Sequence, residues 1–273
     1  MLHLSALIRA LVACAALAPC AETQPSASAP RDLDWQAPLR WVHVDNVDAT
    51  QAQSFEEARK GWLAALRTES GLLEDGRPLF WHARTGTAQT YFTLYPFRKW
   101  ADLDARRETV AQTQKTVGAE AVRAYDTCDA TLVPPHYSQV WRREGDYDVS
   151  WPDNERLTEL SAGVGRLEIH ELDVRHEDEF DRLWKEVKDA LIARKYPLAC
   201  RVYASVFGNG ETMLLWLAPD AAAYRTAPTV QAVLAQELGA EKSADVVAAL
   251  EKIFPLQKSY EVERRADLSN LGR

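Results

Sequence analysis

Polar side chains with binding or catalytic chemistry recur on the segments that the sequence predicts to be β-strands. Imidazole, guanidinium and phenol groups stand there at alternate positions, and alternate residues of a strand share one face of a sheet. A cleft with this lining can bind an anionic or aromatic molecule, and an imidazole beside a carboxylate can act as a general base near neutral pH. The sequence therefore predicts a ligand-binding cleft lined by His43, His82, Arg84, His170, Arg201 and Tyr203.

The same residues also admit a structural interpretation. Arg201 can pair with Glu168 or Glu261, and ion pairs of this kind hold two polar sheets together without any catalytic role. In both interpretations the plainly apolar strand faces, such as that of Val42 and Val44, are expected to pack against helices. The polar faces are then expected to look toward the open side of each sheet.

Motifs that specify catalysis or metal binding are missing from the sequence. The histidines at positions 43, 82, 136, 170 and 176 form no HExxH motif, and no two cysteines form a CxxC pair. A GxSxG nucleophile elbow and a Walker-type phosphate loop are also absent. We therefore predict no metal site, name no catalytic residue and favour a protein that is not an enzyme.

The first 21 residues have the order of an export signal. Arg9 precedes an apolar run from Ala10 to Ala18, and Cys20 and Ala21 offer a cleavage zone of small residues. Cleavage there releases a periplasmic or secreted protein, which is the outcome we favour. The alternative is a lipid anchor at Cys20, because residues 17–20 resemble a bacterial lipobox in which Pro19 replaces the expected small residue. Residues 22–37 are expected to form a flexible tether rich in Pro, Ser and Ala.

Two cysteines, Cys128 and Cys200, lie downstream of this leader in different halves of the chain. In an oxidising compartment they can form a disulfide that joins the two halves. The alternative is that they are two separate, small, buried residues. Neither has the flanking sequence of a catalytic thiol.

Composition restricts the class of protein and of partner. The chain of 273 residues is 47% hydrophobic and 26% charged, which excludes a mainly disordered protein. Its net charge of −8 argues against a nucleic-acid partner. No segment after the leader is apolar and long enough to span a bilayer. A small molecule is the expected partner, and dimerisation stays open.

An internal repeat organises the sequence. The segment Gly118-Ala119-Glu120 recurs as Gly239-Ala240-Glu241, 121 residues later, and Pro134, Ser138 and Arg143 recur in the same register. Each copy shows the same order of patterns. A strand is followed by an amphipathic helix, two strands joined by a turn, a helical region broken at Gly118 or Gly239, and a last strand.

The order βαββαβ, twice, predicts an α+β fold of two tandem ferredoxin-like repeats. We place the first repeat at residues 38–150, a linker at 151–163, the second repeat at 164–268 and a tail at 269–273. Because one face of each sheet is left without helices, the two copies are expected to pack as an intramolecular, pseudo-dimeric barrel.

In element order and lengths, residues 38–268 resemble the dimeric α+β barrel superfamily, which includes antibiotic-biosynthesis-monooxygenase-like and NIPSNAP-like domains. The resemblance implies a barrel with a cleft. It also implies three kinds of function found among such proteins, namely cofactor-independent oxygenation, haem binding or breakdown, and no catalysis. No catalytic pattern of the family maps onto this chain.

The favoured interpretation is an exported, non-catalytic barrel that binds a small ligand and needs no cofactor. One alternative is a cofactor-poor oxygenase or a haem-associated enzyme that uses one cleft. The other is a module of the cell envelope that binds a partner protein.

Overall fold

A computed structural model describes residues 37–68, 79–85, 88–159, 161–207 and 210–269. The first repeat contains three helices and four strands, which are β1 (Leu39–Asp48), α1 (Ala52–Thr68), β2 (Leu79–Thr85), β3 (Ala88–Phe97), α2 (Trp100–Thr116), α3 (Ala119–Ala130) and β4 (Leu132–Arg143). The second repeat contains β5 (Val164–Glu171), α4 (Glu177–Ala193), β6 (Ala199–Ser205), β7 (Glu211–Ala218), α5 (Ala221–Thr226), α6 (Val230–Leu238), α7 (Ala240–Ile253) and β8 (Leu256–Arg264).

The strands form one closed barrel in the order β1-β3-β2-β8-β5-β7-β6-β4, and every pairing is antiparallel. Each repeat contributes a four-stranded sheet. The sheets meet along two short seams, where Trp81 of β2 lies opposite Arg264 of β8 and Trp141 of β4 lies opposite Ser205 of β6. This arrangement confirms the predicted fold of two ferredoxin-like repeats packed as a pseudo-dimeric α+β barrel.

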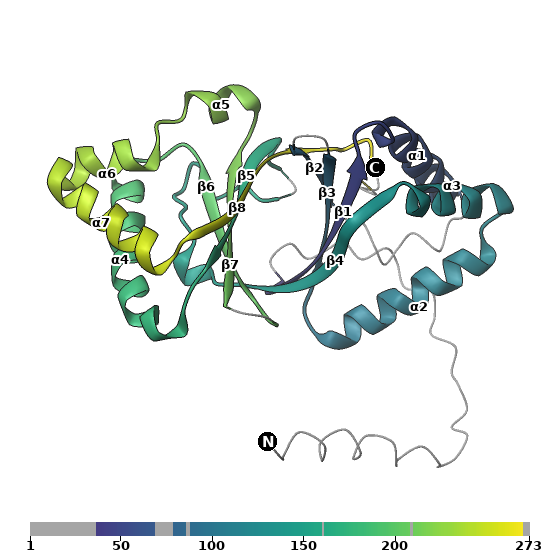
Figure 1. The fold of residues 1–273 in the computed structure, drawn as a ribbon, viewed down its shortest axis with the longest axis horizontal. Coiled ribbons are helices and arrows are strands. Elements are labelled where there is room, and N and C mark those ends of the chain that lie inside the picture. Colours follow the sequence, from purple (N-terminus) through teal and green to yellow (C-terminus); the bar gives the residue numbers. More distant parts are fainter. Residues whose placement is uncertain (1–36, 69–78, 86–87, 160, 208–209, 270–273) are drawn as a thin grey trace, which may run out of the picture.

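Helices cover the two outer flanks of the barrel (Figure 1). Helices α1 to α3 lie on the side of the first sheet, and α4, α6 and α7 lie on the side of the second. Among the described helices, none combines the length and the apolar composition that a bilayer crossing requires.

Local sequence signals explain most of the element ends. The helical region of the first repeat breaks at Gly118, as predicted. In the second repeat Gly239, with φ of 87°, separates α6 from α7. A further break that we did not predict separates α5 from α6, where the Thr229 side chain accepts a hydrogen bond from the Ala232 amide at the start of α6. β3 includes Pro96 and ends at Phe97.

The expected orientation of several strands was wrong. Val42 and Val44 of β1, and Leu167 and Ile169 of β5, belong to the apolar cluster inside the barrel and do not pack against helices. Closure of the barrel removes the inner faces of both sheets from water, so the most apolar strand faces are stable there. The polar faces of these strands consequently lie under the helices.

The two helix–sheet interfaces differ in polarity. In the second repeat one large apolar cluster, built around Phe180, Trp184 and Trp216, fills the space between sheet and helices. In the first repeat three smaller apolar clusters take its place. Polar groups on β1, among them His43 and the buried Asp45, share that interface.

Candidate functional site

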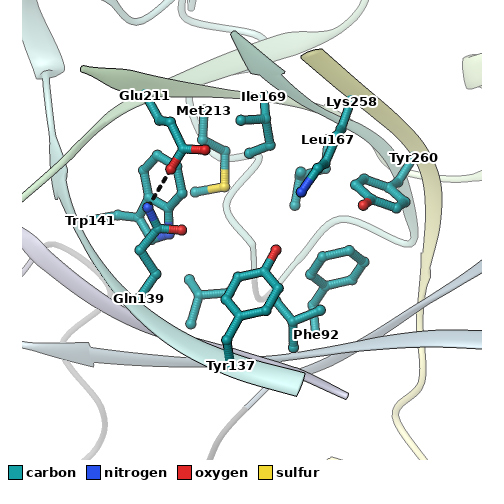
Figure 2. A pocket seen from close by; sticks show the side chains of 12 residues that line it. Phe92, Tyr137, Gln139, Trp141, Leu167, Ile169, Glu211, Met213, Lys258 and Tyr260 are labelled. Atoms are coloured by element: carbon teal, nitrogen blue, oxygen red, sulfur yellow. Dashed lines mark hydrogen bonds between the residues drawn. The ribbon is translucent and has the colours of Figure 1, made fainter. Parts of the chain in front are cut away.

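A pocket opens at one end of the barrel, between the two repeats (Figure 2). The cavity itself has a volume of about 20 Å³, and the empty space counted together with its open mouth is about 390 Å³. Ligand pockets in proteins have volumes of about 300–1,000 Å³, so this cavity as it stands has room for about one water molecule and not for a drug-sized ligand. The residues that line it come from six strands of both sheets, and they are Val42, Val44, Phe92, Tyr137, Gln139, Trp141, Leu167, Ile169, Glu211, Met213, Lys258 and Tyr260.

The floor of the pocket is apolar and its rim is polar. Aliphatic side chains and Met213 form the floor, and the aromatic rings of Phe92 and Tyr260 meet edge to face with centroids 5.2 Å apart. At the rim the Gln139 amide donates a hydrogen bond to Glu211 Oε2 at 2.6 Å. The Lys258 ammonium lies 6.0 Å from the centroid of the Tyr137 ring, and both side chains point toward the pocket in Figure 2. In chemical character the floor suits an aromatic or aliphatic group and the rim suits an acidic or carbonyl group, but entry of a ring requires rim side chains to move.

The tyrosines of this pocket stay neutral at physiological pH. Burial raises the pKa of Tyr260 above its ordinary value. Burial, with contributions from Tyr260 and Glu211, likewise raises the pKa of Tyr137. Both phenols can therefore donate a hydrogen bond to a ligand oxygen, but neither can serve as a base near pH 7.

The opposite end of the barrel is closed by the segment that joins the repeats. Ala162 and Leu157 of this segment pack on the interior cluster. Glu159 accepts a hydrogen bond from Arg40 Nε at 3.1 Å and another from the Tyr203 hydroxyl. Arg40 and Glu159 are 0% and 2% exposed. We call Arg40, Glu159 and Tyr203 the barrel plug, because they seal this end with a fully buried ion pair.

A wider and more polar hollow lies outside the plug, and three of its charged groups form ion pairs with one another. The guanidinium of Arg143 lies 2.6 Å from Asp148 Oδ2. Arg201 lies 3.7 Å from the same carboxylate and donates a hydrogen bond to the Leu157 carbonyl at 2.7 Å. The structural interpretation of Arg201 is therefore the observed one, although its partner is Asp148 and not Glu168 or Glu261.

The structure does not bring the six predicted cleft residues together. Tyr203 and Arg201 lie at the plugged end of the barrel. His43, His82 and His170 lie on the outer faces of the sheets, under the helices, because the inner faces are apolar. The side chain of Arg84 is outside the described ones.

Each of these histidines has partners of its own. His82 stacks on Tyr91 and bonds Gln89 Oε1 at 2.6 Å. His170 stacks on Phe254 with centroids 4.3 Å apart. The prediction that they form one polar cleft was therefore wrong.

The rim residues Tyr137, Gln139, Glu211, Lys258 and Tyr260 were missed by sequence reasoning. A weak signal existed, because Tyr137 and Gln139, like Lys258 and Tyr260, stand two residues apart on the last strand of each repeat. What the sequence did not reveal is which face of that strand turns inward.

The two described cysteines are free, and they lie in different apolar clusters. Cys128 packs beside Phe55 of α1, and Cys200 belongs to the apolar core of the second repeat. The disulfide alternative therefore does not hold in this structure. Cys20 and the predicted leader lie outside the described residues.

We expect both thiols to be inert toward an exposed-thiol reagent at pH 7.5 in the native protein and reactive in denaturant. Burial raises the pKa of Cys128 to about 11 and raises that of Cys200 well above its ordinary value, so little thiolate forms. Peptide mapping after labelling assigns the sites. Rapid labelling of the native protein, or absence of both thiols in denaturant, would contradict this expectation.

The pocket does not suit haem. No histidine and no cysteine is among its lining residues, so imidazole and thiolate ligands for iron are lacking. Its tyrosines would have to bind iron as phenolates, and burial disfavours that form. We therefore derive no chemistry through haem at this site.

Comparison with known proteins adds information on the fold. No protein-family model and no curated protein matches the chain. Among solved structures, a protein of Fusobacterium nucleatum that is provisionally described as a monooxygenase is 9% identical, with a TM-score of 0.52 over 84% of this chain and 92% of that one.

Two further structures are similar at lower scores. A protein of Lactobacillus acidophilus with the same description is 10% identical, with a TM-score of 0.48 over 84% of this chain and 94% of its own. A haem-binding protein of Thermus thermophilus is 11% identical, with a TM-score of 0.47 over 84% and 92% of the two chains. At these identities the likeness concerns the fold. The chain has the dimeric α+β barrel fold, in which two repeats of one chain take the places of two subunits.

Proposed function

We propose that this protein is a non-catalytic binder of a small aromatic molecule that carries an anionic or carbonyl group. The observation that carries the proposal is the pocket at the open end of the barrel, whose floor is apolar and whose rim presents Lys258 and two neutral phenols. The ligand ring enters by displacing exposed rim side chains such as Tyr137 and Lys258, because the cavity itself is only about 20 Å³. Burial of the ring on the floor supplies affinity, and the rim groups orient its polar end.

The chemistry of the rim supports binding and gives little support to catalysis. Of the residues that line the pocket, Glu211 is the only carboxylate, and it accepts a hydrogen bond from Gln139. No imidazole lines the pocket, and the pKa values of both tyrosines are raised by burial. A base that operates near neutral pH is therefore missing from the lining. The proposal includes export of the protein, in which the segment 1–21 acts as the signal.

Anilinonaphthalene sulfonate, an aromatic anion whose fluorescence rises in apolar surroundings, is the probe for this site. We expect saturable binding with one probe per chain. Val44→Phe places a ring in the pocket and should weaken binding at least about 10-fold, the equivalent of ~1.4 kcal/mol of lost burial. Lys258→Gln should weaken binding by up to about 5-fold, since a partly exposed ion pair contributes up to about 1 kcal/mol.

Lys252→Gln is the matched control, because Lys252 is an exposed lysine of α7 that does not line the pocket. It should leave probe binding unchanged, and melting curves show whether each variant is folded. Equal affinity of the wild type and a folded Val44→Phe variant would refute the proposal. Oxygen-dependent conversion of an aromatic anion by the purified protein would contradict a non-catalytic role and support the oxygenase alternative.

A further inference from the structure

A cluster of metal-ligating side chains lies on the outer face of the first sheet, away from the barrel pocket. His43 and Asp45 of β1 and His136 of β4 each offer a ligand atom, and these atoms all lie within 4.8 Å of one another. An irregularity in the β1–β4 pairing brings them together. Val44 pairs with Tyr137 but Asn46 pairs with Val133, so three residues of β4, including His136, lie opposite Asp45 alone.

His43 and Asp45, two residues apart on β1, are in direct contact. His43 Nε2 lies 2.8 Å from Asp45 Oδ1, yet this oxygen, buried in a residue that is 8% exposed, has no partner with hydrogen-bond geometry. Two atoms this close that are not aligned with one another can both direct lone pairs at a shared cation. Oδ1 of the buried Asp45 carboxylate thus lacks an aligned hydrogen-bond donor.

The neighbours of His43 fix the orientation of its ring, as hydrogen-bond partners do for histidines that bind a metal. Nδ1 lies 2.8 Å from the Ser138 hydroxyl, and donation of the Nδ1 hydrogen to that oxygen leaves Nε2 with a free lone pair. The ring also stacks on Trp41, with an interplanar angle of 3°. The rings of His43 and His136 are nearly perpendicular, with centroids 6.1 Å apart, and the exposed His136 side chain can move toward the ion.

From this geometry we infer that His43, Asp45 and His136 bind one divalent transition-metal ion. Two imidazoles and one carboxylate are ligands that suit Zn²⁺ or Fe²⁺ and that suit Mg²⁺ poorly. The exposure of His136 leaves coordination positions open to solvent. Positive charge from Arg59 of α1 interacts with Asp45 and repels a bound cation, which lowers the expected affinity.

The second repeat shows why the site belongs to the first repeat alone. At the corresponding positions β5 carries Glu168 and His170, but Gln257 stands where the first repeat has His136. Glu168 already accepts a hydrogen bond from the Trp216 indole at 2.8 Å and pairs with Arg166 at 3.0 Å. A third ligand is absent there, and the carboxylate is satisfied.

Titration calorimetry of the untagged protein with ZnCl₂, and visible absorption with Co²⁺, test the inference. We expect one ion per chain, tetrahedral or five-coordinate Co²⁺ absorption, and no binding of Mg²⁺. His136→Ala removes an exposed ligand and should weaken Zn²⁺ binding more than 10-fold, and Ser138→Ala should weaken it by about 10-fold through loss of the Nδ1 partner. Because both side chains are exposed, these variants should fold normally.

His176→Ala is the matched control, since His176 is a partly exposed histidine at the start of α4, paired with Glu179 at 3.5 Å in the other repeat. It should bind Zn²⁺ as the wild type does. If Zn²⁺ does not bind, or binds equally to wild type and His136→Ala, the cluster is only a histidine–aspartate ion pair and the inference is wrong.

Discussion

Replacement of Glu159 by glutamine is expected to destabilise the protein by about 3 to 5 kcal/mol, the usual cost of leaving one member of a buried ion pair alone. Arg40 is fully buried and donates to Glu159, which also accepts the hydroxyl of Tyr203. Without the carboxylate charge, the buried guanidinium of Arg40 keeps its hydrogen bonds to the Ala37 and Leu39 carbonyls but loses the negative charge of Glu159. Urea denaturation followed by circular dichroism at pH 7 measures the loss.

The pH dependence of this effect has a definite sign. Burial acts to raise the pKa of Glu159, but Arg40 and the Tyr203 hydroxyl outweigh it and hold the pKa below its ordinary value. A carboxyl whose pKa is depressed by folding contributes stability above its unfolded pKa of about 4.3, and this contribution is lost as the pH falls through the folded pKa. The stability difference between wild type and variant should therefore be largest near neutrality and narrow in acid.

Glu179→Gln is the control for this experiment, because Glu179 is an exposed helix residue that pairs with His176 at the surface. We expect a change within about 0.5 kcal/mol. A Glu159→Gln variant that unfolds at the same urea concentration as this control would show that the barrel plug contributes nothing to stability.

Replacement of Trp81 by alanine is expected to cost about 3 to 5 kcal/mol, the range for a large aromatic removed from a core. Trp81 is 2% exposed and belongs to the interior cluster of the barrel. It lies on the seam between the repeats, opposite Arg264 of β8 and over Gly165 of β5, where an added Cβ would stand 3.4 Å from the ring. Its loss leaves a cavity that both sheets share.

Since the two repeats build one interior, we expect the Trp81→Ala protein to unfold in a single cooperative transition at lower urea concentration. Trp100→Ala is the matched control, because Trp100 is 47% exposed at the start of α2 and should contribute less than about 1 kcal/mol. Two separate unfolding transitions, in which only the first repeat is weakened, would show that the repeats are independent units.

The element order was predictable because it depends on local patterns. The helical spacing of Phe180, Leu183 and Val187 predicts α4, and the glycine at 239 predicts the break between α6 and α7. The match between residues 118–146 and 239–267 is likewise a property of the sequence alone. Together these signals predicted two ferredoxin-like repeats. Because one face of each sheet is not covered by helices, they also predicted that the two sheets pack into a barrel.

The candidate site was not predictable in the same way. Alternation along β1 separates Val42 and Val44 from His43 and Asp45, but it does not say which set faces the partner sheet. We expected the polar side chains on the open face of each sheet, where they would line a cleft. Barrel closure instead buries that face, and apolar side chains occupy it. The histidines consequently lie outside the barrel, and Tyr137 and Lys258 line the pocket.

The sequence by itself determined the type and order of the elements, the duplication and the absence of known catalytic motifs. Only the tertiary structure decided which strand faces became the interior, which charges formed the barrel plug, and that His43, Asp45 and His136 meet. The physical reason is the range of the interactions. Backbone propensities and periodic burial act over a few residues, whereas the pocket depends on contacts between strands more than 100 residues apart, such as that of Phe92 with Tyr260.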